Sequence, residues 1–113
     1  MNRRPPIPPH PDLLRTPPRS FGWLDARLLR DEWLGSLGVE AVAVLTLLAL
    51  AADAHGASFY RRETMALALS TPRRELDRSL ERLVELGLVA HRPWRPGHID
   101  GVWQLLPVPP GRR

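Results

Sequence analysis

The chain contains no cysteine and no lysine, although 16 of its 113 residues are basic. Without cysteine it can form neither a disulfide nor a zinc–thiolate site, and this composition fits a reducing compartment. All basic residues are therefore arginine, which suits bidentate contacts with phosphate and guanine. A GC-rich genome explains the same bias, so the arginine content alone does not identify a partner.

Long hydrophobic segments are also missing. The longest apolar run, residues 41–52 (AVAVLTLLALAA), has about half the length needed to span a bilayer and is better interpreted as a buried helix. The first 20 residues are rich in proline and arginine and lack the apolar centre of a signal peptide. We therefore expect a cytoplasmic protein without a membrane partner.

The chain also has none of the common catalytic motifs. It contains no phosphate-binding glycine loop, no nucleophile elbow and no metalloprotease helix motif. His91, His98 and Asp100 fall near one expected hairpin, where polar surface residues are the simpler interpretation than metal ligands. We expect no enzymatic activity, no metal, no cofactor and no small-molecule substrate.

The most informative segment is residues 65–89 (MALALSTPRRELDRSLERLVELGLV), which predicts two helices joined by a tight turn. Apolar residues recur there at spacings of three, four and seven, giving each helix one buried face: Met65, Leu69, Leu76, Leu80 and Leu83. Ser70 and Thr71 offer a capping hydroxyl, followed by Pro72 at the first helical position. Gly87 can adopt the left-handed conformation that ends a helix.

The remaining elements follow in a simple order. Residues 21–37 predict one or two short helices with a buried side, and residues 39–53 predict a helix that is apolar nearly all round. That helix must be covered on two sides, the second side by residues 21–37 or by a dimer partner. The expected order then continues with a strand at 57–60, helices at 62–69 and 72–86, a strand at 88–91, a hairpin tip at 92–101 and a strand at 102–106.

This order and the 65–89 motif resemble winged helix-turn-helix DNA-binding domains. The first half of the chain, residues 21–59, is similar to the opening of helix-turn-helix domains in plasmid and phage replication initiators, and small bacterial regulators share the fold. The resemblance implies a mainly α fold with a small β-wing (α+β): three core helices, an N-terminal helical extension and a β-hairpin wing. We expect a disordered Pro/Arg-rich arm at 1–20, the domain at 21–107 and a tail at 108–113.

Charge is distributed unevenly along the chain. The net charge is +4, but residues 21–60 carry −3, whereas residues 1–20 and 61–95 each carry +3. The basic charge therefore lies where the resemblance implies contact with DNA. The candidate DNA-binding residues are Arg61, Arg62, Arg73, Arg74, Asp77, Arg78, Arg92, Trp94 and Arg95.

Each candidate has an alternative interpretation. Arg74 and Arg78 point outward on helix 72–86, but i,i+3 pairs with acidic residues would make the same face a solvated surface. Trp94 either projects from the hairpin between Arg92 and Arg95 or is packed between its neighbouring prolines. Arg61 and Arg62 begin helix 62–69, where positive charge opposes the helix dipole, which suggests another use for them.

The sequence thus predicts a non-enzymatic protein that binds double-stranded DNA in transcription, replication or the movement of a mobile element. Helix 72–86 would read the major groove, while the wing contacts the backbone. The alternative is a winged-helix module that binds protein and not DNA. Both interpretations are compatible with a homodimer.

Overall fold

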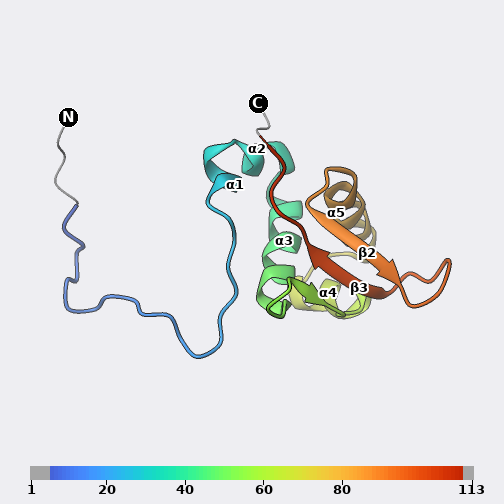
Figure 1. The fold of residues 1–113 in the computed structure, drawn as a ribbon, viewed down its shortest axis with the longest axis horizontal. Coiled ribbons are helices and arrows are strands. Elements are labelled where there is room, and N and C mark those ends of the chain that lie inside the picture. Colours follow the sequence, from blue (N-terminus) through green and yellow to red (C-terminus); the bar gives the residue numbers. More distant parts are fainter. Residues whose placement is uncertain (1–5, 111–113) are drawn as a thin grey trace.

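The computed structural model describes residues 6–110, and this part of the chain is a mixed α+β fold of five helices and a small antiparallel sheet (Figure 1). The helices are α1 (Arg27–Arg30), α2 (Trp33–Leu37), α3 (Val39–Ala51), α4 (Arg62–Leu69) and α5 (Arg73–Glu85). The strands are β1 (Ala57–Ser58), β2 (Val89–Pro93) and β3 (Gly101–Leu105). Most of these bounds agree with the sequence-based expectations to within two residues.

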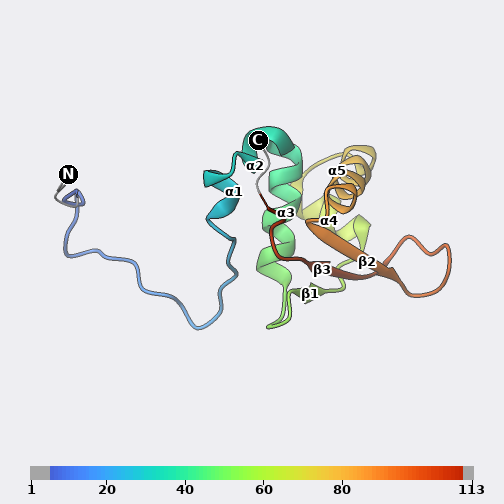
Figure 2. The same cartoon turned by 45° about the horizontal axis from the view of Figure 1, so that its top comes forward.

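Helix α3 lies at the centre of the domain (Figures 1 and 2). It packs against α4, α5 and the sheet on one side and against α2 on the other. Leu28, Trp33 and Leu37 of the N-terminal helices are buried in the same core as Val44 and Leu48 of α3. Side chains of the segment 21–37 therefore cover part of the second face of this helix.

The turn between α4 and α5 differs from the expectation in its chemistry. Neither Ser70 nor Thr71 caps α5; the residue at the N-cap is Pro72, whose extended backbone (φ −61°, ψ 143°) leaves it just outside the helix. Ser70 is left-handed (φ 52°) and ends α4, while the Thr71 hydroxyl donates a hydrogen bond to Glu40 of α3. Because the Pro72 ψ of 143° lies outside the helical range, the helix begins only at Arg73.

The sheet has the order β1-β3-β2, with β3 paired antiparallel to both neighbours. Gly87 has φ 78°, a left-handed conformation, and ends the turn from α5 into β2, as the sequence predicted. Strand β2 extends to Pro93, which pairs with Gly101, so Arg92 belongs to the strand and not to the hairpin tip as expected. A proline is tolerated there because β2 is an edge strand.

Outside the core, residues 6–20 are exposed along their length and form neither helix nor strand, while the remainder of the predicted arm (1–5) and of the tail (111–113) lies outside the described residues. Val108 is buried in the core, one residue beyond the expected end of the domain. Within the described chain, no helix has the length and apolar character needed to cross a membrane.

The core packing predicts the effect of truncating Leu80, which is 1% exposed on α5. The Leu80→Ala variant should lose about 2–5 kcal/mol of unfolding free energy because the removed atoms leave a cavity. The matched control is Leu67→Ala on α4, since Leu67 is 76% exposed and its truncation should change stability by less than about 0.5 kcal/mol. Urea denaturation measures both, and equal losses would contradict the packing of α5.

Candidate nucleic-acid interface

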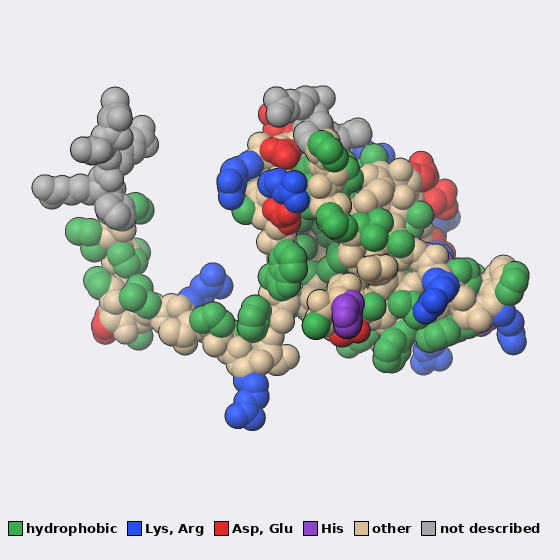
Figure 3. All heavy atoms as spheres, viewed as in Figure 1, with side chains coloured by type: hydrophobic (Ala, Val, Ile, Leu, Met, Phe, Trp, Pro, Cys, Tyr) green, Lys and Arg blue, Asp and Glu red, His purple; other side chains and the backbone are tan. Residues whose placement is uncertain are grey.

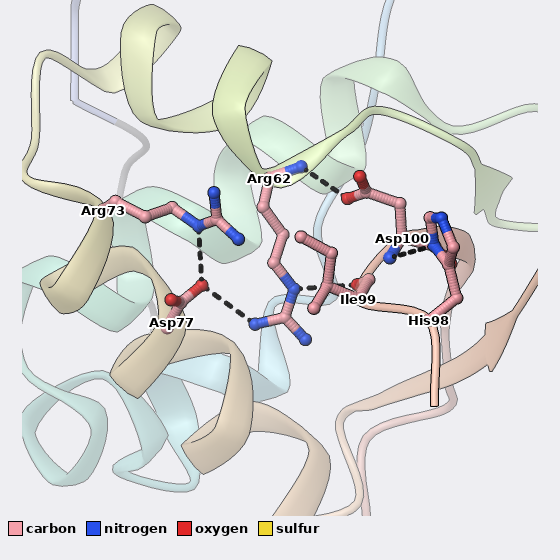
Figure 4. A network of polar contacts seen from close by, with 6 residues as sticks. All are labelled: Arg62, Arg73, Asp77, His98, Ile99 and Asp100. Atoms are coloured by element: carbon pink, nitrogen blue, oxygen red, sulfur yellow. Dashed lines mark hydrogen bonds and ion pairs between the residues drawn. The ribbon is translucent and has the colours of Figure 1, made fainter. Parts of the chain in front are cut away.

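Arg62 connects three elements of the domain (Figure 4). Its guanidinium donates one hydrogen bond to the Ile99 carbonyl in the hairpin loop (2.9 Å) and another to the Asp77 carboxylate on α5 (2.9 Å). Its backbone N–H donates to the Asp100 carboxylate (2.9 Å). The start of α4, the face of α5 and the β2–β3 hairpin are therefore held in one arrangement by a single residue.

Asp77 is the shared acceptor of this network. Arg73, one turn earlier on α5, also donates to it (3.0 Å), so one carboxylate oxygen receives two guanidinium groups (Figure 4). Partial burial by itself would raise the pKa of the Asp77 carboxyl, but the hydrogen bonds from Arg62 and Arg73 outweigh it and lower that pKa. Asp77, one of the predicted DNA-binding residues, thus already accepts two guanidinium groups from within the domain.

Behind the network, Arg62 and two aromatic side chains form a stack. The Arg62 guanidinium carbon lies 5.1 Å from the centre of the Trp103 ring, and the His91 ring stacks on Trp103 at a centroid distance of 3.8 Å. Desolvation lowers the pKa of His91, and the positive charge of Arg62 lowers it further. His91 and Trp103 are register partners across β2 and β3, so their side chains lie on the same face of the hairpin, where Trp103 is buried.

A second group of arginines remains exposed. Within residues 6–110 the ion pairs are Arg27–Asp25, Arg62–Asp77 and Arg73–Asp77. The exposed arginines without a carboxylate partner in this region include five of the predicted DNA-binding residues: Arg61, Arg74, Arg78, Arg92 and Arg95.

The acidic residues of α5 do not neutralise this group. The i,i+3 pairs Arg78–Glu81 and Arg82–Glu85, which would have made the face a solvated surface, are not formed in the described structure. Arg82 instead donates to the Ser36 carbonyl of α2 (2.9 Å). The N-terminal half of α5 therefore presents Arg74 and Arg78 as exposed guanidinium groups that form no ion pair with a described residue.

The hairpin loop presents Trp94 in a defined position. Its backbone N–H donates to the Asp100 carbonyl (3.0 Å), and the Asp100 N–H donates to Nδ1 of His98 (3.0 Å), which closes the loop. Gly97 turns the chain with φ 80°, which favours glycine. The Trp94 residue remains 57% exposed, so the neighbouring prolines do not bury it.

The structure thus separates the predicted site residues into two roles. Arg62 and Arg73 both donate to Asp77. The other predicted residues are exposed on the start of α4, on α5 and on the hairpin: Arg61, Arg74, Arg78, Arg92, Trp94 and Arg95. Sequence reasoning missed Ile99, Asp100 and Trp103 as partners of Arg62. The one available signal was the unfavourable position of an arginine at the start of a helix, which its bonds to the hairpin explain.

No protein-family model matches this chain, and neither a curated protein nor a solved structure matches it.

The Arg62 network predicts a difference between two adjacent arginines. Arg62→Ala should lose about 1–3 kcal/mol of unfolding free energy because charge-assisted hydrogen bonds to Asp77 and Ile99 disappear. The neighbouring exposed Arg61 serves as the control, and Arg61→Ala should change stability by less than about 0.5 kcal/mol. Chemical denaturation followed by circular dichroism compares them. If the two variants were equally stable, Arg62 would not tie the hairpin to the helices.

His91 predicts a pH dependence of stability. Because its folded-state pKa is lowered, the unfolded chain binds a proton first as the pH falls. The contribution of His91 is complete above the unfolded pKa of about 6.5 and is lost as the pH drops below it. Melting temperatures measured from about pH 7 to pH 5 should fall in the wild type and fall less in His91→Phe, which keeps the stack on Trp103. The exposed His55→Gln variant is the control and should retain the wild-type slope.

Proposed function

We propose that the domain is a winged helix-turn-helix that binds double-stranded DNA without enzymatic activity. In this proposal α4 and α5 form the helix-turn-helix, α5 is the recognition helix, and the β2–β3 hairpin is the wing. The order of elements supports it: a helix, a short strand, two helices and a β-hairpin, with the short strand paired beside the hairpin. We place the protein in transcription, or in the replication or movement of a mobile element.

The observation that carries the proposal is the pair Arg74 and Arg78. Both are exposed on the N-terminal half of α5 and lack a carboxylate partner among the described residues. In helix-turn-helix domains this half of the second helix contacts base edges in the major groove, and arginine there donates to guanine.

The hairpin supplies the second contact. Arg92 and Arg95 flank the exposed Trp94 on a hairpin that projects from the domain, and basic side chains lie along it in Figure 3. Arginines in this position reach phosphates or a minor groove. The Arg62 network fixes the hairpin relative to α5, so we give Arg62, Arg73 and Asp77 a positioning role.

A protein-binding module is the second candidate function. Glu81 and Glu85 are exposed on the C-terminal half of α5, and Trp94 offers an apolar contact next to basic groups. This surface would suit a partner protein, and its binding would depend less on salt than DNA binding does.

The test is fluorescence anisotropy with a mixed-sequence DNA duplex at increasing salt. We expect log affinity to fall linearly with log salt concentration, because bound arginines release counterions from phosphates. If Arg74 and Arg78 contact bases, replacing either by alanine should weaken binding by about 1–3 kcal/mol. If one of them contacts a phosphate, its replacement should also reduce the salt slope by about one unit.

Arg30→Ala is the matched control, since Arg30 is an exposed arginine on α1, away from α5 and the hairpin (Figure 1). It should leave affinity and salt slope unchanged. Wild-type affinity in both α5 variants would refute the recognition face, and no binding even at low salt would favour the protein-binding module.

A further inference from the structure

The N-terminal segment leaves an unusual number of large apolar side chains in solvent. Phe21 is 62% exposed, Trp23 74% and Leu24 41%, and Leu50 near the end of α3 is 68% exposed. Single exposed apolar residues are normal on a protein surface, but contiguous ones mark an interaction site. We call these four residues the N-terminal apolar surface.

Gly22 makes this surface continuous. A Cβ atom at position 22 would lie 2.8 Å from Leu50 Cα, so the chain passes directly over the α3 backbone and only glycine fits there. The close approach places Phe21 and Trp23, on either side of Gly22, next to the exposed Leu50. The apolar residues of two separate elements therefore form one patch.

A groove of about 760 Å³ adjoins the patch. Phe21, Trp23 and Leu24 form one wall, and Leu105, Leu106 and Pro107 form part of the other. Hydrophobic side chains gather over this part of the molecule, between the N-terminal segment and the end of β3 (Figure 3). The apolar surface is thus hollowed and can receive a protruding side chain.

We propose that the N-terminal apolar surface is a homodimer interface, on which a second copy of this chain places the same residues. The four exposed side chains offer on the order of 500 Å² of apolar area, and the groove walls add to it; a standard stable interface needs about 800 Å² from each partner. The four side chains therefore supply more than half of one partner's share of an isologous, self-complementary contact, and the groove walls supply further area.

The polar groups beside the patch are already bonded within the chain. Asp25 and Arg27 form an ion pair (2.8 Å), and the Asp53 carboxylate accepts the backbone N–H groups of His55 and Ala57. These groups therefore need no partner from another protein, and the contact of two identical surfaces would be made by the apolar side chains.

The location of the patch keeps the two surfaces of the protein separate. The N-terminal segment and the hairpin lie on opposite sides of α3 (Figures 1 and 2). Dimerisation through the N-terminal apolar surface would leave α5 and the hairpin accessible in both copies. The proposal does not depend on DNA binding, and its test contains no DNA.

Analytical ultracentrifugation of the full chain tests the proposal. At about 50 µM we expect the wild type to sediment with twice the 12.8 kDa mass of the chain. Trp23→Ala should weaken the dimer at least ~30-fold, as truncation of a central interface tryptophan does. Leu50→Glu, on the other element of the patch, should have the same effect because two carboxylates would face an apolar contact.

Trp94→Ala is the matched control, because it also removes an exposed tryptophan, but from the hairpin. This variant should leave the dimer intact. Circular dichroism should show folded protein in all three variants, since each altered side chain is largely exposed. A wild type that remains at the single-chain mass overturns the proposal. A loss of dimer in Trp94→Ala as large as in Trp23→Ala overturns it as well.

Discussion

The structure depends on the burial of α3. This helix carries apolar residues on nearly every side, so no single neighbouring layer can remove it from water. Helices α4 and α5 with the sheet cover one side, and Leu28, Trp33 and Leu37 cover part of the other. The N-terminal extension is therefore part of the fold, and what it leaves exposed at Leu50 becomes a candidate surface for a second chain.

Around that core, a single guanidinium sets the geometry of the proposed binding face. Arg62 bonds to α5 through Asp77, to the hairpin through Ile99 and stacks over Trp103. A hairpin held only by its strand ladder could rotate against the helices, whereas these contacts fix the exposed arginines of both elements on one body. Recognition by two elements at once needs such rigidity.

The sequence by itself determined most of the local structure. The apolar spacing placed Leu76, Leu80 and Leu83 on the buried face of α5, and the structure confirms all three because helical periodicity is a local property. Gly87 ended that helix as expected. The prediction that Ser70 or Thr71 caps α5 was wrong, because capping depends on where the hydroxyl points. The Thr71 hydroxyl donates to the Glu40 carboxylate of α3 instead.

Only the tertiary structure decided which charged residues remain available. Arg62 and Asp77 are 15 positions apart and Arg62 and Ile99 are 37 apart, so no local pattern could reveal that they bind one another. Likewise, the sequence of α3 showed that the helix must be buried on two sides, but not which segment buries the second side. The hydrophobic effect is non-directional, so any apolar segment can do so. Composition and periodicity determined the helices and strands and their buried faces. Long-range packing decided which segment covers α3, which arginines form ion pairs and which remain exposed.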